Sequence, residues 1–133
     1  MSEYEKMLAG QGYDATDPEV IEMLDRTRDL CWRYNQSRPG DETGRRALLA
    51  EILGKDYEDI HINQPFRCDY GRHIRVGCGF FANFGLTVLD EAYVTIGDLS
   101  AHAQGHNIIA ERHVLGRKRQ RQAVFVHFQN IHN

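Results

Sequence analysis

The sequence predicts a mainly β protein, a parallel β-helix with an α-helical cap at its N-terminus. Apolar residues between positions 62 and 94 recur every six residues in two interlocked ladders. A helix would space them by three and four, and a half-buried strand by two, so a period of six indicates hexapeptide repeats. Small or polar residues such as Gly77 and Asn83 would form the corners. One ladder holds Ile62, Cys68, Ile74, Phe80, Leu86 and Ala92, and the other holds Val76, Ala82, Val88 and Val94.

The ladders also bound the size of the predicted β-helix. About six hexapeptides fit between Ile62 and Asp98, and because three hexapeptides make one triangular coil, the sequence predicts about two coils. Continued by sixes, the second ladder demands aliphatic residues where the sequence has Ser100, His106 and Arg112. The alternative is a run of short antiparallel strands whose spacing matches by chance.

Residues 1–58 carry three pairs of helix start and stop signals. Polar N-caps, a proline at a first helical position and glycines at the ends are typical of helix boundaries. We expect these helices to cover the open end of the β-helix, which would otherwise expose unpaired strand groups. The expected starts are Ser2, Asp17-Pro18 and Asp41, and the expected ends are Gly10, residues 37–40 and Gly54. The expected core face of the second helix is Ile21, Leu24, Arg28, Cys31 and Tyr34, and that of the third is Ala47, Leu48, Ile52 and Leu53.

Charge divides the chain at the point where the ladders end. Residues 1–98 hold 18 acidic and 11 basic residues, whereas residues 99–133 hold one acid and five bases together with five of the seven histidines. We therefore predict a helical cap at 1–58, a hexapeptide-repeat segment at 59–98 and a divergent basic tail at 99–133. Disorder of this tail is left open, with one strand expected at 123–128.

The remaining composition indicates a cytoplasmic protein. The three cysteines, Cys31, Cys68 and Cys78, lack the spacing of a secreted disulfide scaffold and are expected to be reduced thiols. The first residues are acidic and lack the apolar run of a signal peptide. No apolar stretch is long enough to span a bilayer.

The order of several motifs resembles the maltose and galactoside O-acetyltransferases of the hexapeptide-repeat family. In the repeat segment these motifs are 66–71 (FRCDYG), 74–77 (IRVG), 80–85 (FFANFG) and 95–98 (TIGD). In the cap they are 4–10 (YEKMLAG), Tyr13-Asp14 and 33–35 (RYN). The resemblance covers the chain from near residue 3 to Asp98 and then stops, which suggests a truncated gene with a foreign ending.

The resemblance implies a left-handed parallel β-helix and a specific activity. It implies acetyl-CoA as co-substrate, direct acetyl transfer to a sugar hydroxyl in a ternary complex, and a homotrimer with active sites between the chains. It assigns no metal. Because holding two substrates together removes much of the entropic barrier, loss of the later coils would impair activity.

The resemblance also points to acceptor-binding residues. The resemblance places Asp69, Asn83 and Glu91 at positions where the family contacts the acceptor. It places Asp14 in the helical cap, which helps to shape the acceptor site in the family. Carboxylate and amide groups suit sugar hydroxyls, which need hydrogen-bond partners in fixed directions. Asn83 can also be explained as a corner residue chosen for turn geometry, and Arg26, a weaker candidate, as a solvated helix charge.

The catalytic base is the least certain part of this assignment. A histidine with a pKa near neutrality suits proton removal from a hydroxyl, and the family places one in a Thr-x-His-Pro or Gly-His-Pro motif that this chain lacks. By position His113 is the candidate, although the histidine-rich tail makes coincidence the default. No residue matches the family's coenzyme A groove.

Other functional classes remain open at this stage. His102 and His106, with His113 beyond them, have a spacing compatible with a metal site, but no carboxylate or cysteine partner stands nearby. The basic run at 117–121 could bind nucleic acid, although a solvated tail is favoured without interleaved aromatic residues. The alternative to an enzyme is a non-catalytic remnant or an interaction module with a basic tail.

Overall fold

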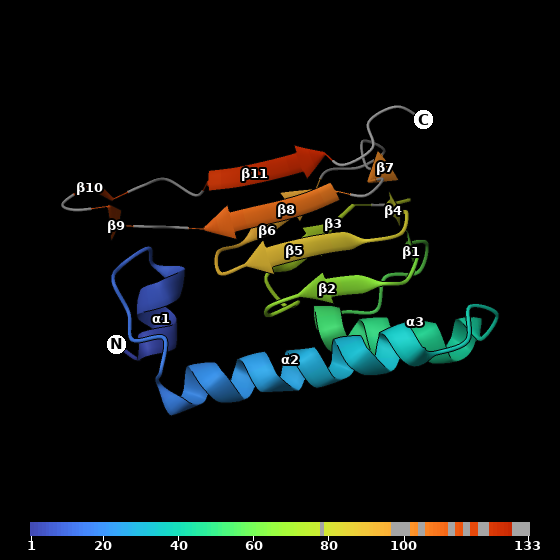
Figure 1. The fold of residues 1–133 in the computed structure, drawn as a ribbon, viewed down its shortest axis with the longest axis horizontal. Coiled ribbons are helices and arrows are strands. Elements are labelled where there is room, and N and C mark those ends of the chain that lie inside the picture. The colour runs from blue at the N-terminus through green and yellow to red at the C-terminus, as the bar shows by residue number, and fades with distance from the viewer. Residues whose placement is uncertain are drawn as a thin grey trace.

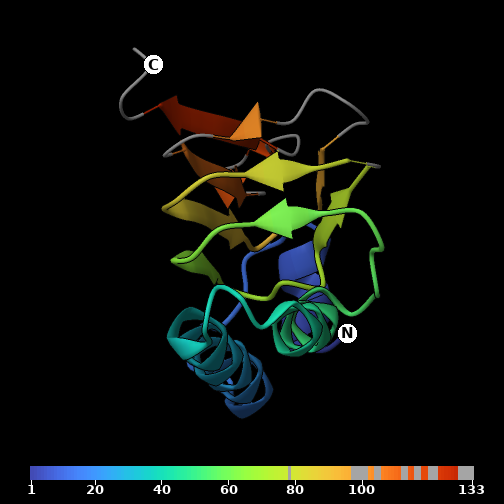
Figure 2. The same cartoon turned by 90° about the vertical axis from the view of Figure 1, so that its right-hand side faces the viewer.

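The molecule consists of a layer of helices beneath a stack of short strands (Figure 1). The computed structural model describes residues 1–77 and 79–96 and, farther along, the backbone of strand residues 102–103, 106–111, 114–115, 118–119 and 123–128. In Figure 2, turned by 90°, the strands lie on different sides of the stack and the helices lie across its lower end. The helical layer therefore covers one end of the stack, as expected from the sequence.

The three helices begin and end where the local signals predict. Helix α1 spans Glu3–Leu8 behind a Ser2 capping box. Helix α2 spans Pro18–Gln36, with Asp17 accepting hydrogen bonds from two N–H groups of its first turn. Helix α3 spans Glu42–Leu53 behind Asp41 and ends at Gly54, which has a left-handed φ of 73°. A polar cap and a glycine stop are local features, which is why they could be predicted.

The buried faces of α2 and α3 differ in part from the prediction. On α2, Ile21 is 43% exposed and Arg28 is also exposed. On α3, Ala47 is exposed and Leu49 is buried in its place. The reason is that the inward faces include polar residues that contact the strands. The buried set is Val20, Thr27, Leu30, Cys31 and Tyr34 on α2, and Arg45, Leu49, Ile52 and Leu53 on α3.

The repeat segment forms six strands that pair in parallel. The strands are β1 (His61–Ile62), β2 (Phe66–Cys68), β3 (Ile74–Val76), β4 (Phe81–Ala82), β5 (Leu86–Asp90) and β6 (Val94–Ile96). Strand β1 pairs with β4, β2 with β5 and β3 with β6, all in parallel. The prediction of parallel strands is confirmed for this segment, and the antiparallel alternative is wrong there.

The register corrects the strict count by sixes. Ile62 pairs with Ala82 and Cys68 with Val88, a shift of 20 residues rather than three hexapeptides. Ile62 and Cys68, from the first ladder, therefore pair with residues of the second ladder. The two additional residues lie between β3 and β4, because the step from Cys68 to Ile74 is six while the step from Ile74 to Ala82 is eight.

The backbone beyond residue 100 extends two of these pairings. Strand β7 (His102–Ala103) pairs in parallel with β4, and β8 (His106–Glu111) with β5. The predicted strand at 123–128 is confirmed as β11 (Ala123–Phe128), which pairs antiparallel with β8. Strands β9 (Val114–Leu115) and β10 (Lys118–Arg119) form an antiparallel pair. The domain boundary at residue 98 stays a prediction.

Helix α2 satisfies the backbone of the lowest strand through side chains. The Asn35 amide accepts from the N–H of Phe66 and donates to its carbonyl, at 2.9 and 3.0 Å. This replaces the neighbouring strand that β2 lacks on that edge. Tyr34 and Arg45 likewise both donate to the carbonyl of Ile62, Arg45 at 3.0 Å. The cap therefore closes the sheet edges with hydrogen bonds as well as with apolar packing.

Candidate functional site

A cluster of acids, here called the carboxyl corner, consists of Asp69, Asp90 and Glu91 where the chain turns after β2 and β5. Asp90 is fully buried, and its Oδ1 accepts from the backbone N–H groups of Asp69 and Tyr70 at 3.0 and 2.9 Å. Its Oδ2 has no hydrogen-bond partner among the described residues. Burial raises the pKa of Asp90. Asp90 therefore fixes the backbone that carries Asp69.

Asp69 and Glu91 form a pair of carboxyl groups on this corner. Both lie next to the buried Asp90: Glu91 follows it in the chain, and the backbone N–H of Asp69 donates to its Oδ1 at 3.0 Å. Burial first, and then the contact with Asp69, raise the pKa of Glu91 to about 9. Glu91 therefore keeps its proton at neutral pH. Such a pair both donates and accepts, which suits the hydroxyl groups of a polyol.

Behind the carboxyl corner lies a buried histidine. His73 is 1% exposed, and its Nδ1 lies 2.5 Å from the carbonyl oxygen of Asp90. Its Nε2 lies 2.6 Å from the hydroxyl of Tyr4 on α1. The ring stacks on Tyr70 with centroids 4.8 Å apart. These contacts connect Tyr4 on α1, through His73, to the backbone of Asp90 at the carboxyl corner.

A second group, here called the amide corner, consists of Asn63 and Asn83 between β1 and β2 and between β4 and β5. Asn83 Oδ1 accepts from the N–H of Phe84 at 2.9 Å and from Asn63 Nδ2 at 3.3 Å. Asn63 Oδ1 lies 2.8 Å from Nε2 of His61. The Asn83 oxygen thus serves the turn, while the Phe84 ring beside it is 65% exposed.

The structure brings together some of the predicted acceptor residues and separates others. Asp69 and Glu91 are in contact, but Asn83 lies at the opposite end of the five-residue strand β5. At about 3.3 Å per residue, β5 alone separates the two corners by roughly 16 Å. Asp14 lies in the exposed segment between α1 and α2, where its Oδ1 accepts from Thr16. One chain therefore does not assemble all four around a single ligand.

Several predicted features lie outside the described side chains. They include His113, the pair His102 and His106, Cys78 and the basic run at 117–121. Within the described part of the chain, no group of three or more acidic, histidine or cysteine residues could hold a metal ion. None of the described helices is long and apolar enough to cross a membrane. Cys31 and Cys68 are buried free thiols.

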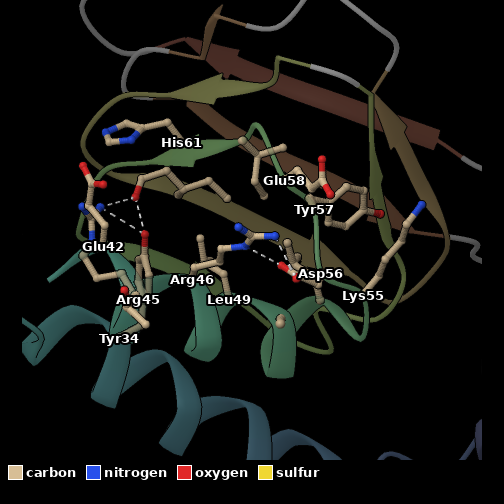
Figure 3. A pocket seen from close by; sticks show the side chains of 15 residues that line it. Tyr34, Glu42, Arg45, Arg46, Leu49, Lys55, Asp56, Tyr57, Glu58 and His61 are labelled. Atoms are coloured by element: carbon tan, nitrogen blue, oxygen red, sulfur yellow. Dashed lines mark hydrogen bonds and ion pairs between the residues drawn. The ribbon is translucent and has the colours of Figure 1, made fainter.

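A cavity of about 360 Å³ is lined by none of the acids of the carboxyl corner and by neither asparagine of the amide corner. It lies between α3 and the segment leading into β1 (Figure 3). Three acids and three bases line it, and the Arg46–Asp56 ion pair, at 2.8 Å, joins two of them. The sequence-predicted acceptor residues are absent from its lining. With balanced charge and a closed ion pair, this cavity offers no chemistry comparable to the carboxyl corner.

Tyr4 and His73 were not predictable as site residues. A lone histidine forms no sequence motif. His73 contacts Tyr4, 69 residues before it, and Asp90, 17 residues after it, so its role depends on contacts between distant segments. Asp90, which fixes the backbone of Asp69, is not among the predicted site residues either. The signal that could have drawn attention to it is the alternation along β5, in which positions 86, 88 and 90 face inward and place a carboxylate in the core.

Comparison with known proteins gives the family. A family model described as the maltose acetyltransferase hexapeptide capping motif matches residues 6–56. Nodulation protein L from Rhizobium leguminosarum bv. viciae is 45% identical over 101 residues, 75% of this chain and 53% of that protein. The chain spans about half the length of the curated relatives it matches.

Two solved structures support the same assignment. A maltose O-acetyltransferase from Clostridium difficile 630 matches with a TM-score of 0.77 and 31% identity, over 90% of this chain and 64% of that one. A hexapeptide-repeat acetyltransferase from Vibrio cholerae, solved with acetyl-coenzyme A, matches with a TM-score of 0.73 and 33% identity, over 93% and 67%. The chain therefore belongs to the hexapeptide-repeat acetyltransferase family that includes the maltose O-acetyltransferases.

Proposed function

We propose that this chain acts in acetyl-CoA-dependent O-acetylation of a sugar hydroxyl, as a cytoplasmic enzyme of the maltose, glucose or galactoside type. The observation that carries the proposal is the gathering of Asp69, Asp90 and Glu91 at one corner, where Asp90 fixes the backbone of Asp69. Family membership supports the reaction class, and the carboxyl pair supports a polyhydroxylated acceptor. The parallel ladders would be the opening coils of a left-handed β-helix.

The carboxyl corner would bind and orient the acceptor. Asp69 accepts a hydrogen bond from one sugar hydroxyl, while the protonated Glu91 donates to a neighbouring oxygen. Orientation of the reacting hydroxyl lowers the entropic part of the barrier. When bound, acetyl-CoA supplies the acetyl thioester; the acetyl carbon exchanges its bond to sulfur for one to the hydroxyl oxygen, and the hydroxyl proton passes to a base. His113 is the candidate base.

The separation of the two corners supports a site shared between chains. A ligand that contacts Asn83 and the carboxyl pair cannot span about 16 Å of strand within one chain. In a homotrimer the amide corner of one chain could face the carboxyl corner of its neighbour, and Phe84, 65% exposed, would then be covered. Covering an exposed aromatic ring stabilises association.

The first test is thiol release from acetyl-CoA with maltose, glucose and a galactoside as acceptors. Asp69→Asn and Glu91→Ala should raise KM for the sugar, because the first replaces an acceptor oxygen with a donor and the second removes the donor at position 91. His113→Ala should lower kcat by about 10²-fold or more if His113 is the base. Glu51→Gln, an exposed acid on α3, is the matched control. Turnover that is indifferent to both corner variants would refute the acceptor assignment.

Subunit mixing tests the shared site directly. Asn83→Ala and Glu91→Ala chains are each expected to be impaired, but trimers containing both would hold one interface with an intact Asn83 and an intact Glu91. Mixed assemblies should therefore recover activity that neither parent has. The double variant mixed with wild-type chains controls for dilution. Absence of recovery from trimers verified by native mass spectrometry would place both residues in separate roles.

A further inference from the structure

A second, smaller cavity lies where α1, α2 and the segment after β2 meet. Its volume is about 190 Å³. It shares no lining residue with the cavity of Figure 3, and neither Asp69 nor Glu91 lines it. The lining residues are Tyr4, Met23, Arg26, Thr27, Tyr70, Arg72 and His73. The cavity is thus a distinct feature beside the carboxyl corner, and none of the roles described above uses it.

The hydrogen bonds of His73 determine what Tyr4 offers to this cavity. The Asp90 carbonyl can only accept, so the Nδ1 of His73 carries the proton in that contact. Burial lowers the pKa of His73, which keeps the ring neutral and leaves Nε2 as an acceptor. The Tyr4 hydroxyl must therefore donate its proton to Nε2. The Tyr4 oxygen is left with lone pairs for a donor in the cavity.

The charged residues that line this cavity are of one sign. They are Arg26 and Arg72, and no acid is among the lining residues. Within the described part of the chain, neither guanidinium takes part in an ion pair. The stem of Arg72 packs over Gly54, where an added Cβ would lie 3.1 Å from its Cγ. Packing therefore restricts where the Arg72 head can reach.

We propose that this cavity binds a small hydroxylated oxyanion. Arg26 and Arg72 would hold the carboxylate or phosphate group, since a guanidinium fork matches either anion with paired hydrogen bonds. A hydroxyl on the same molecule would donate to the Tyr4 oxygen. The volume, below the usual range of roughly 300–1,000 Å³ for ligand sites, limits the ligand to a molecule of the size of glycerate or glycerol 3-phosphate. Binding at this site does not depend on acetyl transfer.

Titration of the full chain by NMR or calorimetry with matched probes tests the proposal. Glycerol 3-phosphate and glycerate are the two anionic arms, inorganic phosphate lacks the hydroxyl, and glycerol lacks the anion. We expect at least one anionic arm to bind, glycerol to fail, and inorganic phosphate to bind more weakly than glycerol 3-phosphate. The arm that binds more tightly identifies the anion as phosphate or carboxylate.

Substitutions assign the binding to this cavity. Arg26→Gln and Arg72→Gln should each weaken binding about tenfold or more, because each removes a charge-assisted contact. Both residues are exposed, so folding should survive the change. Arg28→Gln, two residues along α2 and outside the cavity lining, is the matched control and should leave binding unchanged. Tyr4→Phe should abolish the preference for glycerol 3-phosphate over inorganic phosphate.

Three results would overturn the proposal. The first is failure of both anionic probes to bind at millimolar concentration. The second is equal weakening by Arg28→Gln and the two cavity variants, which would indicate diffuse attraction to surface charge. The third is a Tyr4→Phe protein, with an unchanged melting temperature, that keeps the preference for the hydroxylated phosphate. That result would remove the Tyr4 oxygen from the site.

Discussion

The carboxyl corner and the amide corner occupy the two ends of the same strand, β5, yet they are held in different ways. At the carboxyl corner the buried side chain of Asp90, at the end of β5, accepts hydrogen bonds from the backbone N–H groups of Asp69 and Tyr70 in the turn after β2. At the amide corner the side chain of Asn83 serves its own turn, through the N–H of Phe84. The first corner is part of the core and the second is a surface turn.

The glycines of the two corners show the same difference. Gly71 and Gly85 both have a positive φ, 73° and 86°. A Cβ at Gly71 would lie 2.2 Å from the carbonyl oxygen of Ile52 on α3, whereas at Gly85 it would meet no described atom within 4 Å. The helical cap therefore presses directly on the carboxyl corner, and substitutions there should be costlier than equivalent ones at the amide corner.

The largest expected effect is that of Gly71→Ala. It adds a clash with the α3 backbone to the strain of a positive φ, and should lower the free energy of unfolding by about 4 kcal/mol. Gly85→Ala carries the φ strain alone and should cost about 1 kcal/mol. Urea unfolding of the two variants measures the difference. Equal losses would show that α3 does not press on the carboxyl corner.

The next effect is that of Asp90→Ala, expected to cost about 3 kcal/mol. It removes the acceptor of two buried N–H groups and leaves a cavity in the core. Asp90→Asn retains an oxygen in the Oδ1 position and, since Oδ2 has no partner among the described residues, should cost less than half as much. Denaturant midpoints compare the two variants. An Asn variant as unstable as the Ala variant would mean that the carboxyl charge, rather than its acceptor geometry, holds the corner.

The helical cap was predictable to the residue, and the register of the strands was not. Ser2, Asp17, Asp41 and Gly54 act within one helical turn, so the sequence around each carries the whole signal. Strand pairing depends on how many residues each corner uses. The eight-residue step from Ile74 to Ala82 shifts every later pairing by two, and an unbroken ladder of sixes conceals it.

A smaller, pH-dependent effect should distinguish the corners. Because the pKa of Glu91 is raised to about 9, the folded state holds a proton that the unfolded chain releases near pH 4.5. Stability from this group is present at low pH and is lost as pH rises from about 4.5 through about 9. The melting temperature of the wild-type protein should therefore fall between pH 7 and 9.

Glu91→Gln should flatten this decline, since the amide has no proton to lose. Asp90, with a raised pKa, and His73, with a lowered one, remain in the variant and set its residual pH dependence. Asn83→Ala, at the other corner, should leave the decline unchanged. A wild-type melting temperature that is constant from pH 7 to 9 would contradict the raised pKa of Glu91.

In the candidate site, as in the strand register, the features that the sequence could not predict depend on contacts between distant segments. The assignment of Asp69 and Glu91 to acceptor binding comes from the resemblance to a family and stays a prediction. The raised pKa of Glu91 could not be predicted, because it depends on burial and on the pairing between coils. Asn83 is the converse case: both the ligand-binding and the turn explanations were open, and its hydrogen bond to the Phe84 N–H supports the turn.

The smallest expected effect is at this asparagine. Asn83→Ala removes the oxygen that accepts from the Phe84 N–H and from Asn63 Nδ2. It should lower the free energy of unfolding by about 1 kcal/mol, the typical net contribution of a hydrogen bond. Combining it with Asn63→Ala in a double-mutant cycle should give a coupling of about 0.5 kcal/mol, since the two amides share one contact. A stability unchanged by Asn83→Ala would contradict this structural role, because the turn would then form without the amide.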